Sequence, residues 1–561
     1  MISAILIIIL FVFLSYVYGR GCLWLAQKGI YGAASDLLSP AWVTLLGWVV
    51  ITTLASTLSL MMPLGAAAGG LVLAGALLIL WFGRKTPGFF PQIKGEQTPI
   101  LVWGGLILAG LGILENATHL SLNPDTGIYH AQAIRWIESY AAVPGLGNLH
   151  GRFAFNSSWL VLNALFSFSF LGLQSFHVIP AALVFITVWL FAGGLAGWLG
   201  GENTPANILK TGLLPLVFYV TGAEISSPGT DLPVILLAWI LIAGWLEKGK
   251  GNDSLDVVLF SLSVFAITLK LSAAPLMIFA GLIFISNLND PSRWWRWVSI
   301  GAVVLIPWLL RNVMYSGYPV YPVPGIPGLG FDWRIPQKEV IAEQRAVLAW
   351  GRLPRLDREE VLAMPLVQWL RMWYQDLTLN RRMILFAAAA SPVLMLIEYL
   401  WSAGTKRKDL TAIRGMLPVT GLVYLGGIYW LLTAPDFRFG YGYLIILFAL
   451  PLVYPLMVTA NIQVGKVKIV PIFVSFGILA YQVLFLVQSF DQKTFSQRVW
   501  QPLPYRVLPT EPCEIQNGTI LCAAEESWSE CWYQPFPCIP KPNPRVEFRG
   551  DSLGDGFRKG D

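Results

Sequence analysis

Long, uninterrupted apolar segments recur along the chain and restrict its fold more than any other feature. Two examples are ISAILIIILFVFLSYVYG, close to the N-terminus, and ILVWGGLILAGLGIL, which begins at residue 100. A helix needs about 20 mainly apolar residues to cross the hydrocarbon core of a bilayer. A transmembrane barrel would instead show segments of about ten residues with alternating polarity. The sequence therefore predicts an all-α polytopic membrane protein.

Composition agrees with this class and excludes an ordinary soluble domain. Charged residues make up only 12% of the 561 residues, whereas they make up about a quarter of a soluble domain. From the apolar segments we predict about fourteen membrane spans. Their approximate ranges are 2–19, 41–62, 65–83, 98–116, 178–199, 208–222, 231–246, 254–270, 273–288, 297–311, 383–401, 413–433, 441–459 and 469–488.

Basic residues in short loops predict the orientation of the chain. Under this count, the loops that contain them all lie on one side of the membrane. These residues are Arg84, Lys85, Lys94, Lys248, Lys250, Arg293, Arg296, Lys406, Arg407, Lys408, Lys466 and Lys468. By the positive-inside rule this side is the cytoplasm. The net charge of +6 then reflects orientation, and we expect no nucleic-acid partner.

The predicted spans divide the chain into five regions. They are three extra N-terminal transmembrane helices (1–97), a transmembrane module (98–311), a large extracytoplasmic loop (312–382), the C-terminal transmembrane helices (383–488) and an extracytoplasmic tail (489–561). Loops of this length are usually functional or disordered. The large loop is rich in Trp, Tyr, Pro and Gly rather than in low-complexity sequence, so we expect it to be ordered.

Four of the five cysteines lie in the tail. They are Cys513, Cys522, Cys531 and Cys538. The tail contains no CxxC pair, so a zinc site is not expected. An even number of cysteines in a small extracytoplasmic region indicates two disulfides in an oxidising compartment. Three pairings are compatible with the sequence.

The segment NPDTGIYHAQAIRW, residues 123–136, places titratable groups directly after an apolar run. Asp125 precedes a short amphipathic helix that we expect at the membrane interface, and a second such helix, SSWLVLNALFSFSF, follows. One interpretation is that Asp125 only caps the first helix. The other is a functional site, because scarce ionisable groups cluster in this loop. They include His119, His130, His150 and Arg152.

Two further acids and one lysine are predicted on the same side of the membrane. Glu224 and Asp231 bracket a turn between two spans, and Asp231 could simply cap the helix that follows it. Lys270 is the only charged residue between positions 257 and 289. Its amine could reach the interface as a snorkelling side chain, or it could pair with a lipid phosphate.

The order of these residues along the chain resembles the GT-C superfamily of integral membrane glycosyltransferases. After the acid of the first outer loop and the lysine come PWLLRNVMYSGYPVYP (307–322) and PDFRFGYGYL (435–444). The resemblance covers roughly residues 98–460. DTGIYHAQAIRWI and the tail sequence FRGDSLGDGFR are also similar to an uncharacterised family of large bacterial membrane proteins, which is related to GT-C enzymes by resemblance.

The resemblance implies a GT-C-like module with juxtamembrane helices in its first outer loop. It implies that Asp125 is the catalytic base and that Lys270 and Arg438 neutralise a carrier phosphate. The substrate-binding residues that it implies are Tyr129, His130, His150, Arg152, Glu224, Asp231, Lys270, Arg311 and Arg438. The expected reaction moves a sugar from a polyprenyl-phosphate carrier to a glycan, lipid or protein acceptor. Membrane lipids are the other expected partners.

Metal dependence is not expected. Superfamily members carry paired acids in the first outer loop, whereas Thr126 follows Asp125 in this chain. A divalent metal held by Asp125, His130 and His150 is an alternative, but their spacing matches no metal-binding motif. The sequence also has no Gly-rich phosphate loop after a strand, so we expect no nucleotide and no other cofactor.

Other functions are compatible with the same features. An O-antigen polymerase or ligase would use arginines of a large outer loop, and the loop 312–382 contains eight. A non-catalytic subunit of a membrane complex would keep the aromatic loops, and a transporter would contain internal repeats. The resemblance implies a location in the bacterial inner (cytoplasmic) membrane, with the large loops and the C-terminus extracytoplasmic.

Overall fold

A computed structural model describes most of the chain. It describes residues 1–29, 38–85, 89, 98–248, 253–288, 291–404, 410–460, 463–464, 467–515, 518–524, 529–541, 543 and 545–560. Within these residues, ten helices are long and apolar enough to cross a membrane. They are α1 (Ile2–Gly29), α2 (Pro40–Leu58), α3 (Ala66–Gly83), α4 (Ile100–Ala117), α8 (Ile179–Leu199), α13 (Pro291–Ser316), α17 (Leu379–Gly404), α18 (Leu410–Thr433), α19 (Phe437–Thr459) and α20 (Ile469–Ser489). The chain is thus a multi-pass helical membrane protein.

Four of the predicted spans are shorter helices. They are α9 (Pro205–Thr221), α10 (Asp231–Glu247), α11 (Asp253–Leu269) and α12 (Met277–Ser286), with 17, 17, 17 and 10 residues. At about 1.5 Å per residue, 17 residues extend roughly 25 Å, which is less than the hydrocarbon thickness. The first fourteen residues of α10 are buried among other helices, so this helix packs inside the bundle. Fourteen spans therefore remain a prediction.

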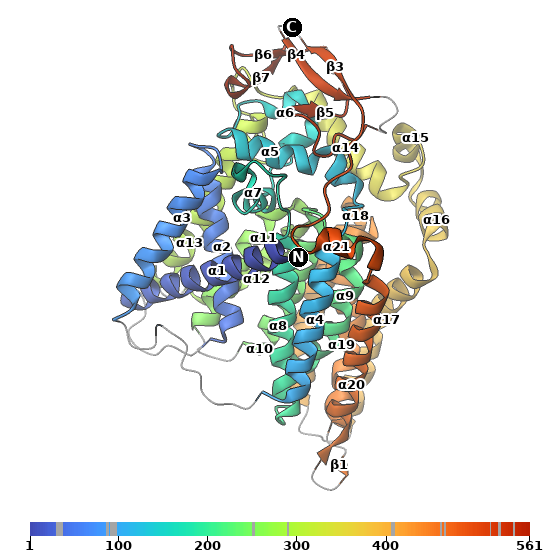
Figure 1. Cartoon of the computed structure of the whole chain (residues 1–561). Helices are drawn as coiled ribbons and strands as arrows, with labels where there is room; N and C mark the ends of the chain where they lie inside the picture. The colour runs from blue at the N-terminus through green and yellow to red at the C-terminus, as the bar shows by residue number, and fades with distance from the viewer. Residues whose placement is uncertain are drawn as a thin grey trace.

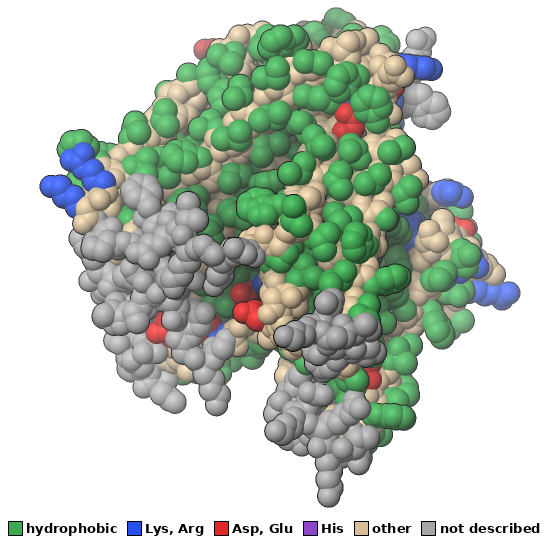
Figure 2. All heavy atoms as spheres, turned by 60° about the horizontal axis from the view of Figure 1, so that its bottom comes forward, with side chains coloured by type: hydrophobic (Ala, Val, Ile, Leu, Met, Phe, Trp, Pro, Cys, Tyr) green, Lys and Arg blue, Asp and Glu red, His purple; other side chains and the backbone are tan. Residues whose placement is uncertain are grey.

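The surface of the bundle suits a lipid environment. Figure 2 shows apolar side chains over most of the visible surface of the helices, with few charged side chains. Large apolar residues on these helices are widely exposed, for example Phe386 at 77% and Phe473 at 76%. Of the basic residues used to predict orientation, Lys94, Lys250, Lys406, Arg407, Lys408 and Lys466 lie outside the described residues.

Short helices and the tail gather at one end of the bundle, at the top of Figure 1, which we call the loop side. The helices are η1 (Thr126–His130, a π-helix), α5 (Ala131–Ser139), α6 (Leu146–Leu149), η2 (Gly151–Ala154), α7 (Ser158–Leu165), η3 (Ser169–Leu171), α14 (Gln337–Arg352) and α15 (Arg358–Ala363). The next helix, α16 (Leu366–Asp376), lies lower, along the side of the bundle. The hairpin of β1 (Gln463–Val464) and β2 (Val467–Lys468) lies at the opposite end of the molecule.

The two helices predicted at the membrane interface are instead covered by protein. All eight residues of α7 are buried, because the helix packs against α2, α5 and α11. The prediction of an amphipathic interfacial helix was therefore wrong for this segment. In α5, Gln132 is fully buried beneath the tail, and its amide bonds to the backbone of Trp532 and Cys538. The polar side of α5 therefore binds another part of the chain rather than solvent.

The tail is a small β structure, and it contains the two predicted disulfides. Cys513 pairs with Cys522 and Cys531 pairs with Cys538, which resolves the three possible pairings. The first disulfide joins the antiparallel strands β3 (Thr510–Ile515) and β4 (Gly518–Ala523), and the short strand β5 (Cys538–Ile539) pairs parallel to β4. A second hairpin pairs β6 (Val546–Phe548) with β7 (Phe557–Lys559).

The tail binds directly to the loop that contains Asp125. The carbonyl of Gly127, in η1, accepts hydrogen bonds of 2.9 Å from the backbone amides of both Cys531 and Trp532. A Cβ atom at Gly127 would lie 2.6 Å from the Trp532 ring, so only glycine permits this approach. The tail therefore fixes the backbone two residues after Asp125.

A buried ion pair attaches the first part of the tail to α4. Arg498, at the end of α21 (Gln492–Arg498), lies 2.6 Å from the carboxylate of Glu115, and the side chains are 0% and 4% exposed. The Arg498 guanidinium also donates to the backbone carbonyl of Glu115 and to the hydroxyl of Thr118. The buried guanidinium of Arg498 therefore has hydrogen-bond partners, and these bonds attach α21 to the loop-side end of α4.

Removing one partner of this pair should destabilise the protein strongly. Glu115→Ala leaves the Arg498 cation buried without its carboxylate, so we expect the free energy of unfolding to fall by about 3–5 kcal/mol. Glu359→Ala is the matched control, because the Arg345–Glu359 pair is 48% and 60% exposed and should contribute at most about 1 kcal/mol. Thermal unfolding in detergent measures both variants. Equal losses of stability would contradict this role of Glu115.

Candidate functional site

Charged residues from four distant segments converge on the loop side of the bundle. Asp125 precedes η1, Asp231 begins α10, Lys270 follows α11, and Arg438 is the second residue of α19. Each of these residues therefore lies where a helix begins or ends, and folding brings these helix ends together. We call this group, together with Arg152 and Asp436, the Asp125 cluster.

The carboxylate of Asp125 lies between two guanidinium groups. Its Oδ1 is 3.3 Å from Nη1 of Arg152, and its Oδ2 is 3.4 Å from Nη1 of Arg438. The Asp125 side chain is 28% exposed, so a ligand can reach it. In the described structure its carboxylate caps no backbone amide of η1. The capping interpretation of Asp125 therefore does not hold.

A second set of ion pairs continues from Arg438. Its Nη1 is 3.8 Å from Oδ2 of Asp231, and its Nε is 3.3 Å from Oδ2 of Asp436. Lys270 forms an ion pair with the other oxygen of Asp231, and its amine lies 4.0 Å from the ring centroid of Phe439. The carboxylate of Asp231 likewise does not cap α10 within the described residues. Three cations and three carboxylates thus balance one another in the Asp125 cluster.

Asp436 and Asn123 complete this arrangement, and neither was among the predicted site residues. The carboxylate of Asp436 caps α19 by accepting from the amide of Arg438. This cap could have been predicted, because an acid before an apolar helix is a common N-cap. Asn123 donates from Nδ2 to Oε2 of Glu224 over 2.7 Å, a contact between distant segments that no local pattern indicates.

The environment separates the pKa values of the acids. Burial alone would raise the pKa of Asp125, but His130, Arg438, Arg152 and Lys270 outweigh it and hold this pKa below its ordinary value. Burial, with the nearby charge of Asp231, raises the pKa of Glu224 to about 6. Asp125 is therefore ionised at neutral pH, whereas Glu224 exchanges a proton close to that range.

Tyr129 and His130 form the aromatic wall beside Asp125. Their ring centroids are 4.2 Å apart, and the Arg152 guanidinium lies 5.6 Å from the Tyr129 ring. Burial lowers the pKa of His130 to about 4, so its ring is neutral. Among the described residues, neither ring nitrogen of His130 has a hydrogen-bond partner.

Two of the predicted site residues, Arg311 and His150, make their contacts outside the Asp125 cluster. Arg311 is 1% exposed and donates to Asn156, Ser59 and Tyr315, so its guanidinium holds α13 against the end of α2. These contacts place Arg311 in the packing between helices rather than in the Asp125 cluster. His150 packs against Phe153, and burial lowers the pKa of His150 to about 3. In the part of the chain that the structure describes, no three His, Cys, Asp or Glu side chains are grouped to hold a metal.

The raised pKa of Glu224 makes stability depend on pH in a defined direction. Between pH 4.5 and about 6 the folded state binds more protons than the unfolded state, so this stabilisation is lost as the pH rises. Glu224→Gln mimics the protonated acid and keeps an oxygen that can accept from Asn123. We therefore expect the variant to gain up to about 2 kcal/mol relative to wild type between pH 4.5 and pH 7.

Chemical unfolding in detergent at several pH values measures this difference, and histidine titration cancels because both proteins contain the same histidines. Asp332→Asn is a control for an acid whose pKa Arg549 lowers below its ordinary value of 3.8. The difference in stability between this variant and wild type should change in the opposite direction, but only below about pH 4, and should stay nearly constant between pH 4.5 and pH 7. A difference for Glu224→Gln that is independent of pH would contradict the assignment.

Comparison with known proteins provides a family but no activity. No curated protein and no solved structure matches the chain. One family model, described as a domain of unknown function (DUF8201), matches residues 1–445. The matched region contains all residues of the Asp125 cluster and ends before the tail. Because the match covers most of the 561 residues, the chain belongs to this family.

Proposed function

We propose that this protein is a GT-C-type glycosyltransferase that takes its sugar from a polyprenyl-phosphate carrier. One observation carries the proposal: an ionised, partly exposed carboxylate, Asp125, lies between Arg152 and Arg438 at the loop-side end of the helix bundle. A lipid-linked phosphate brings its own leaving group, so the reaction needs one base and cations near the phosphate. The Asp125 cluster contains both kinds of group.

In this mechanism Asp125 accepts the proton of an acceptor hydroxyl. The hydroxyl oxygen forms a bond to the anomeric carbon as the bond from this carbon to the phosphate oxygen breaks. The electron pair of the broken bond leaves with the carrier phosphate, and the configuration of the carbon inverts. Arg438 and Lys270 stabilise the negative charge on the departing phosphate.

The charge balance of the site fits an anionic donor. Arg438 contacts three carboxylates, so a phosphate can replace one of them. A displaced Asp125 or Asp231 would still have a cation beside it, Arg152 or Lys270. The entering charge can be compensated by protonation of Glu224, whose pKa is already raised to about 6. Lys270 belongs to the loop-side end of an apolar helix, where a lipid phosphate would lie.

The orientation is part of the same proposal. The loop side faces the extracytoplasmic space of a bacterial inner membrane, and the two disulfides of the tail are appropriate to an oxidising compartment. The alternative of a polymerase or ligase that uses arginines of the loop 312–382 has less support. Two of these arginines, Arg345 and Arg358, pair with Glu359 on the surface.

Replacing Asp125 should abolish transfer and preserve the fold. Asp125→Asn removes the base, and we expect it to lower the stability of the protein only slightly. The two ion pairs of Asp125 are partly exposed, and its carboxylate does not cap η1. We expect incorporation of a labelled sugar from the polyprenyl-phosphate pool to fall about 10²–10⁴-fold at equal protein level. Asp357→Asn, in the exposed cap of α15, is the matched control and should retain incorporation. Unchanged incorporation in Asp125→Asn would favour a non-catalytic subunit or a transporter.

A further inference from the structure

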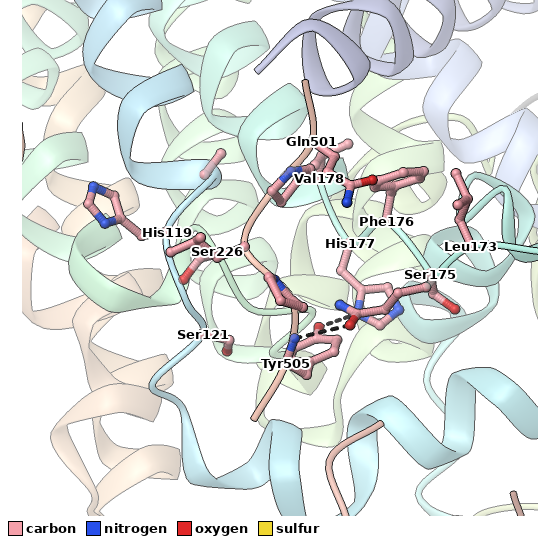
Figure 3. Close-up of a pocket in the computed structure, with 15 residues that line it drawn as sticks. His119, Ser121, Leu173, Ser175, Phe176, His177, Val178, Ser226, Gln501 and Tyr505 are labelled. Atoms are coloured by element: carbon pink, nitrogen blue, oxygen red, sulfur yellow. Dashed lines mark hydrogen bonds between the residues drawn. The ribbon is translucent and has the colours of Figure 1, made fainter. Parts of the chain in front are cut away.

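A cavity of about 80 Å³ lies between the end of α4 and residues 501–505, in the first part of the tail. One water needs roughly 10–15 Å³ of such space, so the cavity has room for several waters or for a sugar-sized group. It is lined by Ala117, His119, Ser121 and Ser226, and by residues 173–178 and 501–505 (Figure 3). Segments that are far apart in the sequence therefore form one cavity that is large enough to bind a small ligand.

Two buried polar side chains that line this cavity each have an atom without a hydrogen-bond partner among the described residues. His177 is 6% exposed; its Nδ1 shares a hydrogen bond with the hydroxyl of Tyr505, while its Nε2 finds no partner among the described residues. Ser121 is 2% exposed, and its Oγ is likewise unpartnered within the described chain. In Figure 3 the two side chains lie on either side of Tyr505. Buried polar atoms without partners are costly, so their position at a cavity points to a ligand.

The lining selects a neutral ligand with hydroxyl groups. None of the described residues that line the cavity is Asp, Glu, Lys or Arg. The imidazole of His119, which also lines it, faces the carboxylate of Glu115 at 3.4 Å, so neither an anion nor a cation would find a free counter-charge among the described residues. Burial lowers the pKa of His177 to about 3, which leaves its ring neutral. Nε2 is then a donor in one tautomer and an acceptor in the other, and a hydroxyl can bond to either form.

Apolar surfaces complete the match to a sugar. The flat or branched side chains of Phe176, Val178, Pro502, Leu503 and Pro504 alternate with the polar groups around the cavity. A sugar ring presents the same combination, with C–H faces and hydroxyl edges. A carrier phosphate, in contrast, would remain at the Asp125 cluster, where the cations are.

Two short segments line the cavity and also contact the backbone around Asp125. Ser226 lines the cavity, and the next residue, Ser227, hydrogen-bonds to Thr126 over 2.6 Å, one position after Asp125. Ser121 lies two positions before Asn123, whose side-chain oxygen accepts from the amide of Asp125. A molecule in the cavity would therefore lie close to the backbone that holds the base.

We propose that this cavity binds a neutral sugar unit of the acceptor and positions the acceptor beside Asp125. The inference rests on the proposed glycosyltransferase function, because an acceptor is required only by a transfer reaction. It adds the chemical class of the acceptor, a neutral glycan, and assigns Ser121 and His177 as acceptor-binding residues.

Direct binding tests this assignment without any transfer reaction. Purified full-length protein in detergent is titrated with methyl α-glucoside, methyl α-mannoside and methyl β-N-acetylglucosaminide, and the thermal unfolding midpoint is followed. We expect at least one glycoside to raise the midpoint of wild type in a saturable manner. Ser121→Ala should weaken its binding roughly tenfold, because one hydrogen bond is lost. His177→Phe should abolish binding, because it removes both ring nitrogens and fills space.

Control variants distinguish binding in the cavity from a general change in stability. Ser56→Ala removes another buried hydroxyl that has no partner among the described residues, in α2 and away from the cavity, and should bind the glycoside as wild type does. Asp125→Asn should also bind normally, so loss of transfer with retained binding concerns the reaction alone. The inference is overturned if no glycoside binds wild type, if glycerol gives the same shift, or if Ser121→Ala and His177→Phe bind like wild type.

Discussion

The guanidinium of Arg438 is the interaction on which the candidate site depends. It contacts carboxylates from three segments, Asp125, Asp231 and Asp436, and so connects the first loop of the central helices with α10 and α19. Ion pairs of this kind contribute little net stability, because taking charges out of water offsets their mutual attraction. A set of six balanced charges therefore fits the proposed function, in which a ligand phosphate exchanges with one of the partners.

The tail packs against the backbone that follows Asp125. Cys531 and Trp532 donate to the carbonyl of Gly127, and the disulfide from Cys531 to Cys538 keeps this part of the tail compact over η1. π-Helical turns occur frequently at functional sites, and here the turn directly follows Asp125. Tyr505, in the part of the tail that precedes β3, lines the cavity. The tail thus contacts the backbone next to Asp125 and also lines the cavity.

Much of this architecture could be predicted from local sequence. Continuous apolar runs predict helices because each run must satisfy its own backbone in a membrane, and isolated charges such as Lys270 and Arg438 mark the helix ends. Other features depend on contacts between distant segments. The partner of Glu224 is Asn123, the role of Gly127 depends on Trp532, and Arg311 is held by Ser59, which directly follows another helix. For the same reason α7, whose sequence suggests an exposed polar side, is buried on all sides.

The most direct test of the proposed function is whether the Asp125 cluster recognises a lipid-linked phosphate. Native mass spectrometry of the purified protein, released from detergent after incubation with either polyprenyl phosphate or the uncharged polyprenol, measures this recognition. We predict an adduct with polyprenyl phosphate that is lost in Arg438→Gln, and little adduct with polyprenol. Equal retention of the two lipids, or a phosphate adduct that survives in Arg438→Gln, would contradict the proposed role of the cluster.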